Sequence, residues 1–70
     1  MAKSPSVYKK IELVGTSKKS FSDAVQNAVT RASDSVHGMG WFEVSELRGR
    51  LDEGKVSEYQ ATVKIGFKLD

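Results

Sequence analysis

The stretch WFEVSELRGRLDEGKVSEYQATVKIGFKL, residues 41–69, decides the fold because two long β-type segments flank a tight turn. Residues 41–51 and 55–69 are rich in β-branched and aromatic side chains, which favour strands. The residues between them, Asp52, Glu53 and Gly54, are typical of a hairpin turn. This stretch therefore predicts an antiparallel hairpin with unusually long arms.

The region before the hairpin predicts one further strand and one helix. Residues 7–17, VYKKIELVGTS, mix β-branched and aromatic residues and end in a Gly-Thr-Ser turn, which predicts a strand. From Ser20 onward, apolar residues recur every three or four positions, as on one face of a helix. These residues are Phe21, Ala24, Val25, Ala28, Val29, Ala32 and Val36. Ser20 and Asp23 resemble a capping box, and Gly38 is where we expect the helix to stop.

The order of elements, β-α-β-β, predicts an α+β fold with one three-stranded antiparallel sheet. A helix between the first and second strands returns the chain parallel to its start. The sheet is antiparallel throughout only if the third strand lies between the other two. We therefore predict the strand order 1-3-2, with the sheet wrapped around one helix.

Turning the hairpin about Glu53 and Gly54 predicts which residues pair and hence two faces of the sheet. The face expected to pack on the helix has Phe42 opposite Ile65 and Val44 opposite Val63, with Tyr59, Ala61 and Phe67. The other face has Trp41 opposite Gly66, Glu43 opposite Lys64, Ser45 opposite Thr62 and Leu47 opposite Gln60. We expect no helix to cover this second face.

Trp41, the only tryptophan of the chain, lies on the uncovered face of this predicted sheet. Beside Gly66, which has no side chain, the indole would leave a gap next to a flat wall, a shape that suits a planar ligand. The alternative is that Trp41 fills a core or an interface between subunits, as large aromatic side chains commonly do. Reasoning from the residues alone leaves both interpretations open.

Length and composition limit the classes of protein to consider. A chain of 70 residues is one domain that buries only about 60% of the surface its unfolded form exposes, so a monomeric core is marginal. There is no cysteine, which excludes disulfides and thiolate metal sites. Short apolar runs and the polar start MAKSPS predict a soluble cytoplasmic protein. We expect residues 1–5 to form a flexible tail and residues 6–70 to form the domain.

The charged and polar residues do not follow patterns typical of nucleic-acid binding or catalysis. Lys and Arg number 11 against 9 Asp and Glu and are interspersed with them, whereas nucleic acid favours a basic stripe. His37, the single His, is expected at the helix end rather than at a metal. Asp34, Ser35 and His37 are too close in sequence to form a catalytic triad. Glu43 is expected to be solvated or to pair with Lys64.

Three segments carry a resemblance to a known family: YKKIELVGTS (8–17), WFEVSELRG (41–49) and EYQATVKIGFKL (58–69). With the amphipathic helix between the first two, they resemble the dodecins, small flavin-binding proteins of archaea and bacteria. The resemblance spans Tyr8 to Asp70 and implies a β-α-β-β chain that assembles into a hollow homo-dodecamer. It also implies that Trp41 stacks on the isoalloxazine ring of a flavin and that Gln60 hydrogen-bonds the ring's polar edge.

The resemblance also implies a phosphate site. Bacterial dodecins with an Arg-Gly pair after WFEV and a cation near the C-terminus bind the phosphate of FMN, which makes Arg48 and Lys68 candidates. Position 68 is Lys rather than the Arg of that pattern, and an ammonium group cannot make the bidentate contact of a guanidinium. FMN is therefore the expected ligand, with riboflavin and FAD as alternatives.

The residue types suit these roles chemically. An indole presents an electron-rich face to an electron-poor flavin, and a glutamine amide both donates and accepts hydrogen bonds. A nearby indole also quenches a photoexcited flavin by electron transfer, so the resemblance implies flavin storage and sequestration without enzymatic turnover. A scaffolding shell without flavin and a flavin-dependent redox enzyme are the competing hypotheses. We expect the chain to associate with itself, and with neither nucleic acid nor membrane.

Overall fold

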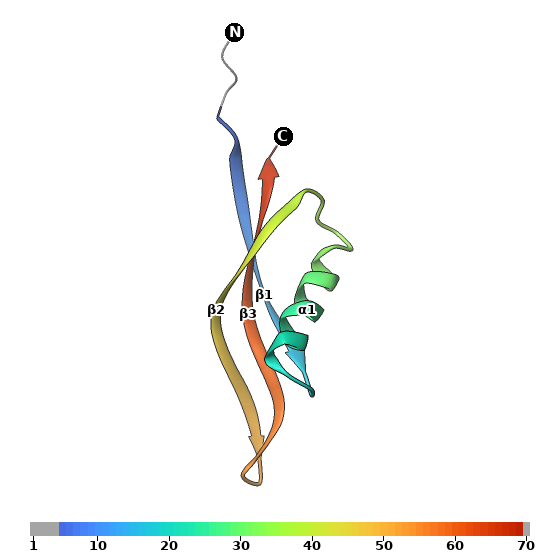
Figure 1. Cartoon of the computed structure of the whole chain (residues 1–70), viewed down its shortest axis with the longest axis vertical. Helices are drawn as coiled ribbons and strands as arrows, with labels where there is room; N and C mark the ends of the chain where they lie inside the picture. The colour runs from blue at the N-terminus through green and yellow to red at the C-terminus, as the bar shows by residue number, and fades with distance from the viewer. Residues whose placement is uncertain (1–4, 70) are drawn as a thin grey trace.

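The computed structural model describes residues 5–69 and confirms the predicted β-α-β-β order. The elements are β1 (Val7–Ser17), α1 (Phe21–Ala32), β2 (Met39–Asp52) and β3 (Lys55–Leu69) (Figure 1). The strands form an antiparallel sheet in the order β1-β3-β2, as predicted. Residues 1–4, most of the expected N-terminal tail, lie outside the described residues.

The start of α1 is tied to the end of β1 by side-chain hydrogen bonds. Ser20, the N-cap, accepts a hydrogen bond on its Oγ from the Asp23 N–H at 3.0 Å, as the capping pattern predicted. The Asp23 carboxylate does not complete a capping box. Instead it accepts a hydrogen bond of 2.6 Å from the Ser17 hydroxyl, so the cap also fixes the turn that leads out of the strand.

The end of α1 comes earlier than the apolar stripe predicted. The helix stops at Ala32, and the expected stop at Gly38 is wrong, although Gly38 does adopt a positive φ of 74° in the loop that follows. Ser33 donates its hydroxyl proton to the Thr30 carbonyl at 2.6 Å, a local bond that competes with helix propagation. Within the described residues, no helix is long and apolar enough to cross a membrane.

The core lies between α1 and the face formed by β1 and β3, and its buried members on the helix are all alanines. The buried core residues are Ala24, Ala28, Ala32, Ala61, Val63 and Ile65. Gly15 on β1 lies where the helix comes closest, because a Cβ there would overlap the Ala24 carbonyl oxygen and stand 2.9 Å from the Ala28 Cβ. Alanines on the helix and a glycine on the strand therefore bring α1 directly onto the sheet.

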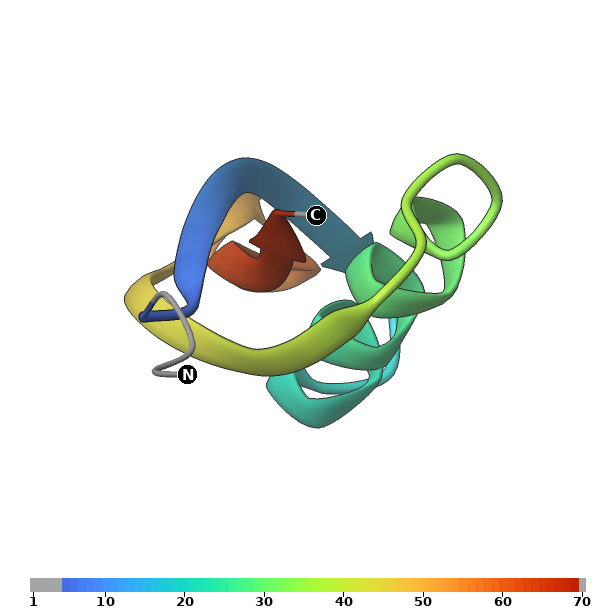
Figure 2. The same cartoon turned by 90° about the horizontal axis from the view of Figure 1, so that it is seen from above.

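The apolar side of β2 is left uncovered, which corrects the expectation that Phe42 and Val44 pack under the helix. α1 packs on β1 and β3 and barely touches β2, and the view from above shows β2 passing to one side of it (Figure 2). Phe42 stays 54% exposed and Val44 is also exposed. A helix is about 10 Å across and strands are about 4.8 Å apart, so one helix covers about two strands.

The predicted register of the hairpin is right near both ends and wrong in the middle. Trp41 opposes Gly66 and Val44 opposes Val63, as expected, but the pairing then shifts by one residue around Ser45. Glu46 therefore opposes Thr62, Leu47 opposes Ala61, and Arg48 opposes Gln60, in place of the predicted Ser45–Thr62 and Leu47–Gln60 pairs. A bulge inserts one unpaired residue and exchanges the faces of those that follow, here as far as Arg50, where a second shift restores the predicted pairing next to the turn. It places Glu46 and Arg48 on the face away from α1.

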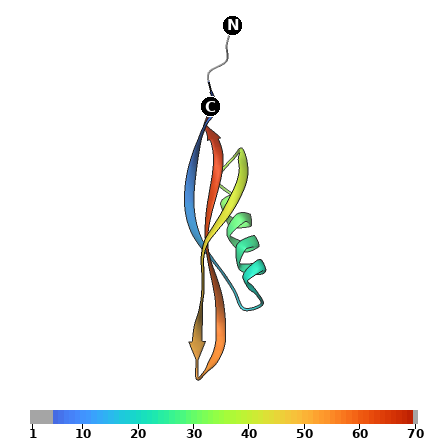
Figure 3. The same cartoon turned by 60° about the vertical axis from the view of Figure 1, so that its left-hand side comes forward.

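The hairpin extends past the rest of the sheet as an arm (Figures 1 and 3). β1 ends opposite Tyr59, so residues 50–58 form only two strands. The turn has positive φ at both Glu53 (52°) and Gly54 (78°), as a type I′ hairpin requires. The radius of gyration is 15.3 Å, whereas that of a 70-residue globular domain is expected to be about 11 Å.

Gly15→Ala should destabilise the protein by about 2 kcal/mol or more, because the new methyl group meets backbone atoms of α1 that cannot move aside. Denaturant unfolding followed by circular dichroism, at one fixed protein concentration, measures the free energy of unfolding. Gly40→Ala is the matched control, since the nearest atom to its Cβ would be the Gly66 carbonyl oxygen at 3.9 Å. Equal stability of the two variants would contradict the packing described above.

The exposed apolar residues of β2 and the arm predict a large oligomer at micromolar concentration. Phe42, Val44, Leu47, Leu51 and Val56 are all more than 40% exposed, which is unusual for so small a monomer. Native mass spectrometry should show a high-order assembly. A spectrum containing only monomer or dimer would contradict this prediction.

Candidate functional site

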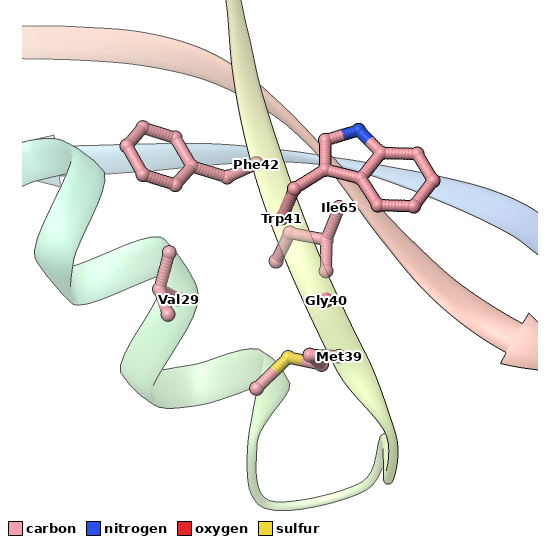
Figure 4. Close-up of a pocket in the computed structure, with 6 residues that line it drawn as sticks. All are labelled: Val29, Met39, Gly40, Trp41, Phe42 and Ile65. Atoms are coloured by element: carbon pink, nitrogen blue, oxygen red, sulfur yellow. The ribbon is translucent and has the colours of Figure 1, made fainter.

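The indole of Trp41 lies on the face of the sheet away from α1 and covers Gly66. In the close-up, the Trp41 and Phe42 side chains point to opposite sides of β2 (Figure 4). A Cβ on Gly66 would overlap three carbons of the indole ring, so only glycine permits this position. The gap predicted above Gly66 is therefore filled by the tryptophan's own ring. Trp41 is still 40% exposed, and its open surface is what a planar ligand can reach.

Tyr8 and Glu43 border the indole. The Tyr8 ring meets it edge-on, with 5.1 Å between centroids and 60° between planes. The indole Nε1 donates to Glu43 Oε1 at 3.5 Å, and the same oxygen lies 2.6 Å from the Lys10 ammonium nitrogen. Glu43 opposes Lys64 in the ladder, but its ion pair is with Lys10 on β1 rather than with Lys64 as expected. The indole is thus held by residues of two strands.

Sequence reasoning did not identify Tyr8 and Lys10 as neighbours of Trp41, because it predicted a register only for the two strands of the hairpin. The strand order 1-3-2 puts β1 on the other side of β3, where Lys10 opposes Gly66 and Tyr8 opposes Lys68. Pairing β1 with β3 in the same way as β2 with β3 would have placed both residues beside Trp41.

The Glu43 carboxylate is ionised at neutral pH. Its hydrogen bond with Lys10, and then that with the Trp41 N–H, hold the pKa of Glu43 below its usual value. Both side chains of the ion pair are about half exposed, so salt weakens their attraction. The indole N–H therefore points at a full negative charge whose own partner is a lysine.

Gln60 and Arg48 form a second polar group, at the end of the three-stranded sheet next to the arm. They oppose each other because of the bulge. Arg48 Nη2 donates to Thr62 Oγ1 at 2.7 Å and to Glu46 Oε1 at 3.0 Å. The Gln60 side-chain amide donates to Glu58 Oε1 at 2.8 Å. The buried hydroxyl of Thr62 thus fixes the guanidinium, while the remaining N–H groups of Arg48 are available to an anion.

The four residues predicted to hold a ligand do not meet within one chain. Gly66, opposite Trp41, and Gln60 are six positions apart on β3, about 20 Å at about 3.3 Å per residue. Lys68 is two positions beyond Gly66, farther still from Arg48. The bulge does not shorten this path, because the extra residue is on β2 and the separation is along β3. Trp41 and Lys68 lie toward one end of the sheet, and the paired Arg48 and Gln60 lie toward the other.

An apolar pocket of about 240 Å³ lies on the helix side of β2. It is lined by Val29, Met39, Gly40, Trp41, Phe42 and Ile65. The Trp41 indole points away from it (Figure 4), so this pocket is separate from the stacking surface. Within residues 5–69, no group of three or more His, Asp or Glu residues is arranged to hold a metal ion.

Comparison with known proteins places the chain in a family. Residues 7–70 match the family model for dodecin, and the chain belongs to the dodecin family. A dodecin of Thermus thermophilus is 47% identical over 64 residues, which cover 91% of this chain and 93% of that protein. A protein of Mycobacterium tuberculosis named calcium dodecin is 36% identical over 64 residues, covering 91% and 90% of the two chains.

Solved structures agree on the fold. The dodecin from Streptomyces coelicolor is similar with a TM-score of 0.91 at 43% identity and covers 97% of both chains. The crystal structure of the Mycobacterium tuberculosis calcium dodecin is similar with a TM-score of 0.80 at 34% identity and covers 91% of both. The family inferred from the sequence segments and the predicted strand order are confirmed, and a dodecameric assembly is consistent with this family.

Proposed function

We propose that this protein binds a flavin, FMN in preference to riboflavin or FAD, and stores it in a homo-dodecameric shell that suppresses its photochemistry. The observation that carries the proposal is the indole of Trp41. It is held over Gly66 on the face of the sheet that α1 leaves open, and Trp41 is 40% exposed. An aromatic ring fixed in this way is a ready stacking surface for the isoalloxazine ring.

The surroundings of Trp41 favour binding because they hold the ring in place before the ligand arrives. Tyr8 meets the edge of the indole, and Glu43 accepts its N–H. A side chain that is already fixed loses little conformational entropy when a ligand stacks on it. The electron-rich indole is also close enough to a stacked flavin to donate an electron to its excited state, which would quench fluorescence and photoreactions.

The proposed role of Gln60 requires more than one subunit. A flavin stacked on Trp41 is too far from Gln60 of the same chain, since the two contacts are about 20 Å apart along β3. A neighbouring copy must therefore present its Gln60. The exposed apolar residues of β2 and the arm provide a surface that brings copies together, so binding and assembly are coupled in this proposal.

Arg48 and Lys68 are the proposed contacts for the phosphate of FMN. Arg48 is fixed by Thr62 and Glu46, and its guanidinium has five N–H donors of which these contacts engage those on Nη2. Lys68 is exposed near the end of β3 and contributes a point charge. Because the two cations are far apart in one chain, they act together only across subunits.

A storage role fits the ionisable groups near Trp41 better than a redox enzyme does. Glu43 is kept ionised by its contact with Lys10, which makes it a poor proton donor at neutral pH. The other competing hypothesis, a shell without flavin in which Trp41 only packs subunits, predicts no ligand uptake. Titration with flavins distinguishes it from the proposal.

Trp41→Ala should weaken flavin binding by well over tenfold and leave the helix content unchanged, because the indole lies away from α1. Equilibrium dialysis with riboflavin, FMN and FAD, with and without Ca²⁺, measures the affinities. Far-UV circular dichroism checks the fold. Phe42→Leu is the matched control, since it changes the neighbouring aromatic residue on the other side of β2 and keeps an apolar side chain there. Unchanged affinity in Trp41→Ala would exclude the stacking site.

Shells that contain both Trp41→Ala and Gln60→Ala chains should recover part of the flavin binding that each variant lacks alone. Some sites in such shells combine an intact Trp41 from one chain with an intact Gln60 from another. Native mass spectrometry establishes the composition of the mixed shells, and dialysis measures the bound FMN. Mixed shells that bind no better than either parent would show that one chain supplies both contacts.

A further inference from the structure

Glu43 is the one carboxylate in the described residues that touches the Trp41 indole. Its Oε1 accepts the Nε1–H at 3.5 Å and lies 2.6 Å from the Lys10 ammonium nitrogen. Lys10 comes from β1, on the far side of β3, so its side chain extends across β3 to reach Glu43 on β2. The three residues form a chain of contacts: ammonium, carboxylate, indole.

A negative charge at the indole N–H changes how readily the ring gives up an electron. When a bound flavin absorbs light, one electron passes from Trp41 to the excited flavin, which leaves a positive indole radical and a negative flavin radical. The same electron then returns, so no bond forms or breaks and both groups recover their resting state. The positive charge on the indole is the unstable part of this cycle, and a carboxylate hydrogen-bonded to it stabilises that charge.

We propose that Glu43 is a positioning residue for Trp41 that also eases removal of an electron from the indole, and so sets the rate at which a bound flavin is quenched. Lys10 is the counter-ion of Glu43 and partly offsets its charge. This inference rests on the proposed flavin-binding function, in which Trp41 is the stacking surface.

The packing around the ring is consistent with this role. Gly66 lies under the indole and Tyr8 stands against its edge, so the ring is confined on two sides by groups without charge. Glu43 supplies the one charged contact, on Nε1, which is the only polar atom of the indole. Removing its charge while keeping its shape therefore tests the electrostatic contribution separately from packing.

Glu12 provides a matched control. It opposes Lys64 from the β1 side, as Glu43 does from the β2 side, and it is exposed on the same face. Glu12→Gln thus removes one negative charge from the same row of the sheet without altering the Glu43–Trp41 contact. Any effect of the overall charge of the protein appears equally in Glu12→Gln and Glu43→Gln.

The test compares assembled wild-type, Glu43→Gln, Lys10→Met and Glu12→Gln proteins loaded with FMN. Transient absorption measures the lifetime of the excited flavin, and dialysis measures affinity. Glu43→Gln should lengthen the lifetime severalfold with a smaller change in affinity. Lys10→Met should shorten it, because the carboxylate then acts without its counter-ion. A Glu43→Gln lifetime equal to that of Glu12→Gln, or an equal lengthening in Glu43→Gln and Lys10→Met, would overturn the proposal.

A second measurement does not need flavin. Trp41 is the only tryptophan, so the decay of its fluorescence anisotropy in flavin-free shells reports how firmly the indole is held. Glu43→Ala, which removes the acceptor of the indole N–H, should add a fast component that Glu12→Ala lacks, and its absence would overturn the positioning role. A wild-type protein that takes up no flavin refutes the proposed function instead, so the two failures are distinguishable.

Discussion

The close approach of α1 to Gly15 on β1 is the constraint on which the rest of the structure depends. A helix lined with alanines lies directly against a strand position that has no side chain, and this contact centres the helix over β1 and β3. One helix is too narrow to cover a third strand as well. The small core and the exposed apolar side of β2 therefore have the same cause.

The uncovered strand leaves a row of apolar side chains exposed on a single chain. β2 and β3 continue past the end of β1 as a two-stranded arm, and apolar residues are exposed along it. A hairpin of this length is marginal in water without additional packing. Arg48 and Gln60 lie at the base of this arm, far from Trp41, so the separated polar groups and the exposed apolar residues both follow from the length of the hairpin.

The face opposite the helix holds a tryptophan whose position is determined from several directions. Gly66 allows the indole to lie over the backbone, Tyr8 meets its edge, and Glu43 accepts its N–H. The chain belongs to the dodecin family and shares its fold with the solved dodecin from Streptomyces coelicolor. In the proposed function, the fixed indole is both the surface on which a flavin stacks and the electron donor that makes its storage safe.

The sequence by itself determined the elements, their order and the strand order 1-3-2, because hydrophobic periodicity, turn residues and the connection rules for sheets are local or topological. It also placed Trp41 opposite Gly66, because the two register shifts between the turn and this pair are opposite in direction and cancel. Family membership followed from segments that keep their order and spacing.

Only the tertiary structure decided the register shifts at Ser45 and between Arg50 and Leu51, which no turn residue marks and between which Arg48 pairs with Gln60. It also decided that α1 leaves Phe42 exposed and that the indole fills the space above Gly66, because both depend on how side chains pack in three dimensions. The contacts of Tyr8 and Lys10 with the site likewise join strands that are distant in sequence. Such contacts arise from the geometry of the folded sheet, which local patterns do not specify.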